Sequence, residues 1–140
     1  MNIAVVSDIH DHVWNLQKAL QIIKEQKCKA IIFCGDFCAP FTAGILSESG
    51  LPIYACFGNN DEDQFAISEK LKAVQLWPLT KEFAEMELDS RKIAFCHYPK
   101  LGKTLLANSG SICGIISGKP AQASFGIYDT KSNNYSQVNL

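Results

Sequence analysis

Carboxylate, imidazole and amide side chains follow four apolar runs of the sequence, each where the run ends. The runs are residues 3–6, 30–34, 53–57 and 92–96. Oxygen and imidazole nitrogen donors of this kind are the ligands that hard and borderline divalent metal ions take in proteins. The same kind of residue at the end of each run predicts a divalent-metal site, with the candidate ligands Asp8, His10, Asp36, Asn59 and His97.

The apolar runs are typical of strands in a parallel sheet. Helical spacing separates the first two, because Val13, Leu16, Leu20 and Ile23 fall on one face of a helix. Further helices are expected at residues 41–49 and around residues 67–74, the last closed by Trp77-Pro78. A βαβαβ unit has parallel strands with right-handed crossovers, and the carboxyl ends of such strands meet in one crevice. The predicted metal ligands therefore converge.

The second half of the sequence predicts antiparallel hairpins. Residues 84–88 alternate between apolar and acidic, turn at 89–90 and continue into 92–96. A second alternating pair, 125–127 and 138–140, flanks the turn at 131–134. No linker or repeat divides the chain, so we predict a single α/β domain spanning residues 1–140.

Each motif alone also has a structural explanation. Gly35-Asp36 could mark a turn, Asp36 could cap the helix that follows it, and His97 could be a core histidine. The glycines at 35 and 58 favour the metal site, because without Cβ they allow a sharp turn beside it. His12 is expected at a helix start on the surface, and Trp14 and Trp77 are expected to be packing residues.

Composition narrows the class of protein. The net charge of −1, from 13 basic and 14 acidic residues, gives no strong nucleic-acid signal. No apolar run reaches the roughly 20 residues of a membrane helix, and no signal peptide is apparent, so a cytoplasmic location is expected. The six cysteines are expected to be reduced and structural, because several of them lie within apolar strands.

The polar motifs resemble those of the calcineurin-like metallophosphoesterases. The matching residues are Asp8-x-His10, Gly35-Asp36, Gly58-Asn59-Asn60-Asp61 and His97. The Gly-Asn-x-Asp form is similar to the small archaeal and bacterial phosphodiesterase branch. The resemblance resumes at Asn108-Ser109-Gly110-Ser111 and runs through the C-terminal hairpin.

The resemblance implies a β-sandwich of two mixed sheets flanked by helices, and a role for each ligand. Asp8 and His10 would bind one metal, Asp36 would bridge two, and Asn59 and His97 would bind the second. It implies Asp36, Asn59 and His97 as the catalytic residues, acting on a metal-activated water. Manganese is the first expectation for the metal, with nickel, magnesium, iron and zinc as alternatives.

The sequence departs from the family in two places. Many relatives carry a leaving-group histidine directly after the motif asparagine, where this chain has Asn60. The family also closes its site with Gly-His-x-His, and no histidine follows His97. The chain therefore looks shortened by one internal segment after Pro99.

Two function classes remain open on the sequence. The first is a divalent-metal-dependent phosphodiesterase acting on a small phosphodiester, with activity reduced by the missing histidine motif. The alternative is a binding or scaffold protein that kept the fold and lost turnover. The oligomeric state is open, with a homo-oligomer as one expectation.

Overall fold

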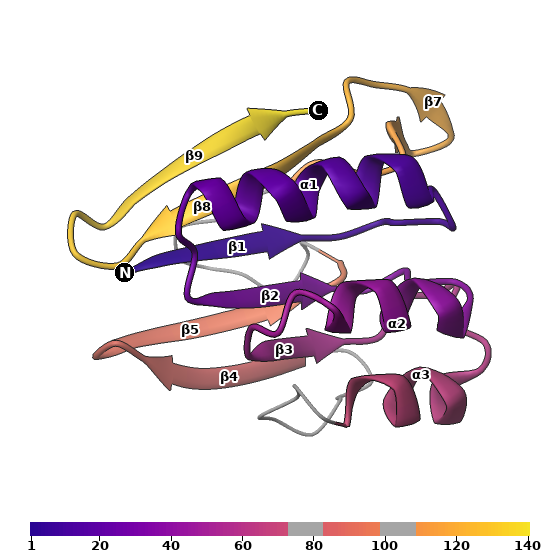
Figure 1. Cartoon of the computed structure of the whole chain (residues 1–140), viewed down its shortest axis with the longest axis horizontal. Coiled ribbons are helices and arrows are strands. Elements are labelled where there is room, and N and C mark those ends of the chain that lie inside the picture. The colour runs from indigo at the N-terminus through magenta and orange to yellow at the C-terminus, as the bar shows by residue number, and fades with distance from the viewer. Residues whose placement is uncertain (73–82, 99–108) are drawn as a thin grey trace.

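The computed structural model of this chain describes residues 1–72, 83–98 and 109–140. Three helices and nine strands lie in these ranges (Figure 1). The helices are α1 (Val13–Glu25), α2 (Pro40–Ser47) and α3 (Gln64–Leu71). The strands are β1 (Asn2–Val6), β2 (Ala30–Cys34), β3 (Ile53–Cys56), β4 (Phe83–Leu88), β5 (Arg91–Cys96), β6 (Ile115–Ile116), β7 (Lys119–Pro120), β8 (Ser124–Asp129) and β9 (Asn134–Asn139).

A mixed five-stranded sheet forms the centre of the molecule, with strand order β3-β2-β1-β8-β9. Strands β1, β2 and β3 are parallel, as the βαβαβ pattern predicts. Ile3 of β1 pairs with Ala30 of β2. Strand β8 then runs antiparallel to β1, and β9 antiparallel to β8. The carboxyl ends of β1, β2 and β3 therefore point to one edge of the sheet (Figure 1).

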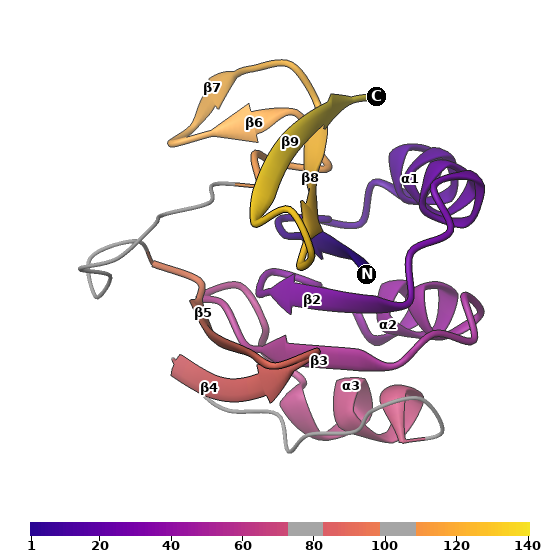
Figure 2. The ribbon, with the colours of Figure 1, turned by 90° about the vertical axis from the view of Figure 1, so that its left-hand side faces the viewer.

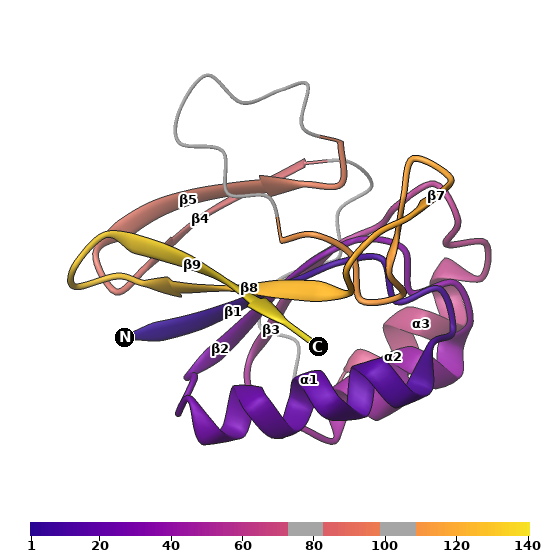
Figure 3. The ribbon, with the colours of Figure 1, turned by 90° about the horizontal axis from the view of Figure 1, so that it is seen from above.

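The sheet is covered differently on its two faces. The three helices lie on one face and the β4–β5 hairpin lies on the other (Figures 2 and 3). Leu16 and Ile23 of α1 belong to a large buried cluster with Phe33 and Phe125 of the sheet. A smaller cluster joins Ile3 and Ile32 to Met86 and Phe95 of the hairpin. These two apolar layers fix β5, and therefore its carboxyl end, against the central sheet.

The α/β fold class and the antiparallel second half are confirmed. In the described ranges the second sheet holds only β4 and β5, which is small for a sandwich. None of the helices in those ranges is long and apolar enough to cross a membrane. All six cysteines are free, as expected.

One expectation needs correction, and one alternative explanation is excluded. Trp14 does not pack in the core, because 74% of its surface is exposed on the first turn of α1. Asp36 does not cap the following helix, since the N-cap of α2 is Ala39 and no side chain bonds it. Trp77 lies outside the described residues.

Candidate metal centre

The loop after β1 and the loop after β2 run side by side at the carboxyl edge of the sheet. The amide of Asp8 donates to the carbonyl of Gly35 at 3.0 Å, and the amide of Ile9 donates to the carbonyl of Asp36 at 2.9 Å. Asp11 strengthens the pairing, because its carboxylate accepts from the amide of Ala39 at 3.0 Å. This pairing brings the polar residues of the two loops together.

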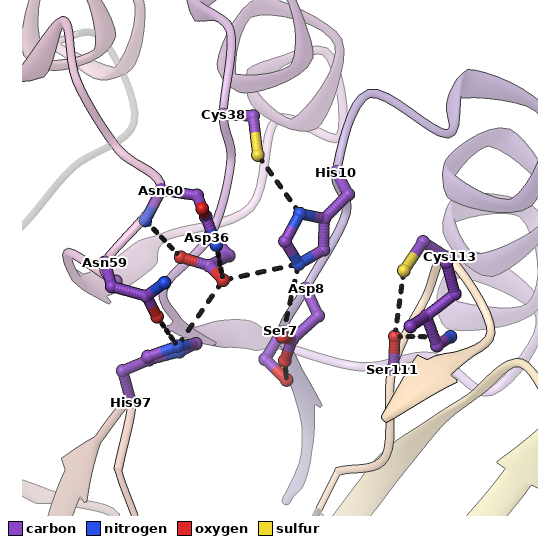
Figure 4. A network of polar contacts seen from close by, with 12 residues as sticks. Ser7, Asp8, His10, Asp36, Cys38, Asn59, Asn60, His97, Ser111 and Cys113 are labelled. Carbon is purple, nitrogen blue, oxygen red and sulfur yellow. Dashed lines mark hydrogen bonds and ion pairs between the residues drawn. The ribbon is translucent and has the colours of Figure 1, made fainter. Parts of the chain in front are cut away.

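Asp36 lies at the middle of the candidate site and is 2% exposed (Figure 4). Its Oδ2 is 3.3 Å from Nε2 of His10 and 3.4 Å from Nε2 of His97. The Oδ1 atom of Asp8 lies 3.5 Å from the same His10 nitrogen. Asp8, His10 and Asp36 together offer ligand atoms within 4.8 Å of one another.

His97 enters the site from the other layer, at the end of β5. Its Nδ1 lies 2.8 Å from the carbonyl oxygen of Cys34, and a carbonyl can only accept. Nδ1 therefore donates a proton to this carbonyl, and Nε2 is the ring nitrogen left to bind a metal ion. Nε2 faces Asp36 and lies 3.0 Å from Oδ1 of Asn59. The carbonyl of Cys34 thus orients the ring with Nε2 toward the other candidate ligands.

Asn60 holds the carboxylate of Asp36 by both of its oxygens. The backbone amide of Asn60 donates to Oδ1 and its side-chain amide donates to Oδ2, each at 2.9 Å. Two neutral donors fix the plane of the carboxylate without adding charge. The residue that stands where many relatives carry a histidine is therefore a positioning residue in this chain.

Asp61 joins the loops after β2 and β3. Its carboxylate is 4% exposed and accepts from three backbone amides, those of Asp36 at 3.0 Å, Gly58 at 2.8 Å and Cys38 at 2.9 Å. A buried carboxylate needs this number of donors to offset its lost hydration. Asp61 is the last residue of the Gly-Asn-x-Asp motif, but the sequence alone assigns it no role.

Gly58 allows Asp36 to approach the third loop. A Cβ at this position would lie 2.1 Å from Oδ1 of Asp36 and 2.6 Å from its backbone nitrogen. No side chain can occupy that space without moving Asp36. The requirement for glycine here is one of close approach.

Ser7 orients the second oxygen of Asp8. Its hydroxyl lies 2.6 Å from Oδ2 of Asp8 and 3.0 Å from both the Ser109 hydroxyl and the Gly110 carbonyl. The C-terminal part of the chain therefore supports the first loop. Nothing in the sequence pattern marked Ser7, whereas the resemblance at residues 108–111 pointed to its partners.

Left-handed backbone is concentrated in these two loops. Asp8, His10 and Asp11 have φ of 54°, 43° and 60°, and Asp36 and Cys38 have φ of 65° and 67°. This conformation costs roughly 1–2 kcal/mol for a residue with a side chain. Strain of this kind is typical of functional sites, where surrounding contacts hold it in place.

The donor set fits a divalent ion that prefers oxygen and imidazole ligands. Burial, followed by the charge of Asp11 and Asp36, raises the pKa of the neighbouring Cys38 thiol to about 12. The Sγ atom of Cys38 lies 3.3 Å from Nδ1 of His10. The structure thus brings all the predicted ligands together, namely Asp8, His10, Asp36, Asn59 and His97 (Figure 4).

His12 lies apart from this group. It is the N-cap of α1, and its Nδ1 accepts from the amide of Asn15 at 3.3 Å. Its position at a helix start is the one expected from the sequence. His12 serves the helix, and its cap contact involves none of the five candidate ligands.

The chain belongs to the calcineurin-like phosphoesterase superfamily, whose domain model matches residues 1–102. Members of this family use divalent metal ions, as the residues of this site allow. Within the family it falls in the small archaeal branch. It is 26% identical to the phosphodiesterase MJ0936 of Methanocaldococcus jannaschii, over 100% of this chain and 99% of that protein.

Solved structures agree with this placement. An archaeal phosphodiesterase superposes with a TM-score of 0.86 at 25% identity, and all of both chains is covered. The phosphoesterase YfcE of E. coli gives a TM-score of 0.67 at 17% identity, covering 99% of this chain and 98% of that one. Vps29 of Chaetomium thermophilum gives 0.62 at 13% identity, covering 99% and 95%. The last two show the fold alone.

The alignment with MJ0936 extends over 168 positions, which exceeds the 140 residues of this chain. The relative therefore has positions without a counterpart here. This agrees with a chain shortened by an internal segment. The joint expected after Pro99 falls in residues 99–108, outside the described residues.

Proposed function

We propose that this protein hydrolyses phosphodiester bonds with divalent metal ions held by Asp8, His10, Asp36, Asn59 and His97. The observation that carries the proposal is the position of Asp36. Its Oδ2 lies between the imidazoles of His10 and His97, at 3.3 and 3.4 Å. A short carboxylate between two nitrogen ligands from opposite layers is suited to a ligand shared by two ions.

Each of the protein groups has a task in this proposal. Asp8 and His10 would hold one ion, Asn59 and His97 would hold the other, and Asp36 would be a ligand of both. When bound, such ions supply positive charge that offsets the charge of the phosphodiester and a nucleophile at neutral pH. Manganese remains the first expectation for the metal. The mixed oxygen and imidazole ligand set also suits nickel, magnesium, iron and zinc.

Asn59 and Asn60 keep the site from becoming too negative. Asn59 offers an oxygen without charge, and Asn60 orients Asp36 through neutral donors. An anionic substrate then meets two ligand carboxylates, those of Asp8 and Asp36. No imidazole lies at position 60 to protonate the leaving group. We therefore expect substrates with good leaving groups, or a leaving group that is protonated by water.

The test is manganese-supported hydrolysis of bis(p-nitrophenyl) phosphate by the wild type, Asp36→Ala and Asp63→Asn. Asp63 is a matched control because its exposed carboxylate only caps α3, through a 3.0 Å bond from the amide of Ala66. The wild type and Asp63→Asn should turn over, and Asp36→Ala should lose at least about a hundredfold in rate, since it removes a ligand common to both ions. Equal rates in all three proteins contradict the proposal.

A second function is favoured by one observation, the absence of any histidine after His97 in the sequence. The family motif Gly-His-x-His is therefore missing, and each ion keeps three of this chain's ligands. The alternative is a binding or scaffold protein on this fold, without turnover. No hydrolysis with Mn²⁺, Ni²⁺ or Mg²⁺ in the wild type would favour it.

A further inference from the structure

Several of the exposed large apolar side chains of the described residues lie in segments that adjoin the loops of the candidate metal centre. Three of them are the second residues of the three helices, Trp14, Phe41 and Phe65. Their surfaces are 74%, 49% and 78% exposed. Each helix begins directly after a loop of the site, so each ring lies beside one loop.

The β4–β5 hairpin and the C-terminal segment carry the other exposed apolar side chains. Phe83 begins β4 and pairs with Cys96 at the end of β5, next to His97. Ile115 and Ile116 follow Cys113, whose amide donates to the carbonyl of Asp8. Tyr98 lies one residue beyond His97 and is 55% exposed. We call the side chains at positions 14, 41, 65, 83, 98, 115 and 116 the apolar rim.

Tyr98 connects the rim to the site itself. Its ring meets the ring of His97 edge to face, with the centroids 4.8 Å apart and the planes at 67°. The imidazole of His97 faces Asp36 and Asn59 through Nε2. The phenol ring is therefore the neighbour of a residue that would contact a group bound at the site.

The charges at this edge argue against a long polyanion. Of the basic residues in the described ranges, Lys119 of β7 lies in the hairpin of Ile115 and Ile116, and the exposed Lys18 lies one helical turn from Trp14 on α1. Acidic residues are frequent there, including Asp11, Glu62 and Asp63. Nucleic acids are held by lysine and arginine contacts to many phosphates, and such a groove is absent from the described part of this edge. A small ligand with one phosphate is the better fit.

We propose that the substrate is a small phosphodiester carrying a nucleobase or another flat aromatic group, which stacks on Tyr98 at the apolar rim. This deepens the proposed function and rests on it. Aromatic side chains bind bases through their π-faces without regard to sequence. Tyr98 is then a specificity-determining residue, and the metal ligands contact only the phosphate.

The kinetic test compares two diesters of equal charge, the dinucleoside monophosphate adenylyl-adenosine and the aliphatic glycerophosphoglycerol, with Mn²⁺. The wild type should prefer the first in kcat/KM. Tyr98→Ala should lower that preference about fivefold or more through KM, since stacking is worth about 1–3 kcal/mol per base. Tyr98→Phe keeps the ring and should keep the preference.

A binding arm separates this inference from the proposed function. Calorimetry should show adenosine 5′-phosphate binding more tightly than glycerol 3-phosphate, with the difference reduced in Tyr98→Ala and retained in Tyr98→Phe. Hydrolysis of both diesters with equal kcat/KM, or an equal loss on both in Tyr98→Ala, overturns the inference and leaves the function standing. Absence of all hydrolysis together with equal binding of the two monoesters overturns both.

Discussion

Nε2 of His97 lies 3.4 Å from Oδ2 of Asp36, although the two residues come from different layers of the molecule. Asp36 follows β2 of the central sheet, and His97 follows β5 of the covering hairpin. The contact depends on the apolar cluster that holds Phe95 against Ile32 and Cys56. Packing between the layers therefore sets the geometry of the candidate metal centre.

Asp61→Asn should weaken both the fold and metal binding. The amide keeps one acceptor oxygen and turns an NH₂ group toward the backbone amides of Asp36 and Gly58 or Cys38. We expect a loss of about 2 kcal/mol in the free energy of unfolding. We also expect about a tenfold or greater loss in Mn²⁺ affinity, because Asp36 is no longer held.

Asp63→Asn is the control for that substitution, two residues along the same loop. It should change stability by no more than a few tenths of a kcal/mol, since asparagine caps a helix about as well as aspartate. Urea unfolding and calorimetric titration with Mn²⁺ measure both quantities. Equal metal affinity of wild type and Asp61→Asn would remove Asp61 from the positioning network.

Gly58→Ala should displace Asp36. The added Cβ overlaps Oδ1 and the backbone nitrogen of Asp36, so about 2 kcal/mol of stability is expected to be lost by overpacking. Gly44→Ala is the matched control inside α2, where the Cβ would meet only Cδ of Lys70 at 3.8 Å. That variant should gain about 0.5–1 kcal/mol. Thermal unfolding of the two variants checks the contrast, and a stable Gly58→Ala with full Mn²⁺ binding refutes it.

Acid should remove a contribution that Asp89 makes to stability. A hydrogen bond from the Thr130 hydroxyl, followed by one from the α-amino group of Met1, lowers the pKa of Asp89. A carboxyl whose pKa is lowered on folding stabilises the protein above its unfolded pKa, and this is lost as pH falls through the folded pKa. Asp89→Asn should therefore unfold at a lower temperature than wild type at pH 7, and the gap should close in acid.

The control for Asp89 is Glu62→Gln, which alters an exposed carboxylate on the loop after β3. Its unfolding temperature should track that of the wild type at each pH. Melting curves by circular dichroism from pH 7 to pH 2 give the comparison. A gap between Asp89→Asn and wild type that persists unchanged at the acid end contradicts the assignment.

Much of the fold could be predicted from local pattern. Uniformly apolar runs such as residues 30–34 indicate strands covered on both faces, and β2 is buried between the helices and the hairpin. The convergence of Asp8 and Asp36 also follows from topology, since both come after parallel strands. Local pattern sufficed because these elements obey one periodicity each.

The remaining features depend on contacts distant in sequence. Ser7 has a role only because residues 109–110 pack beside it, and no hydrophobic periodicity in the sequence predicts that contact. Trp14 has the hydrophobicity of a core residue, yet its position on the first turn of α1 leaves it exposed. Asn60 is recognised as a donor to Asp36 only once the loops after β2 and β3 are positioned next to each other.

This protein should bind metal ions more weakly than family members that carry the Gly-His-x-His motif. In the proposed assignment each ion would have three ligands from the five candidate residues, and a site with fewer ligands holds a metal less tightly. Calorimetric titration of the metal-free protein with Mn²⁺ should give micromolar or weaker binding. Two tight sites in that titration would show that the residues missing from the sequence motif are replaced by others.

The most direct measurement of the central claim is a Mn²⁺ titration followed by electron paramagnetic resonance on wild type, Asp36→Ala and Asp63→Asn. Free Mn²⁺ gives a strong signal that falls when the ion binds. The wild type and Asp63→Asn should remove Mn²⁺ from solution in a saturable way, and Asp36→Ala should not. Identical curves for wild type and Asp36→Ala, or no saturable binding by the wild type, would contradict a metal centre built on Asp36.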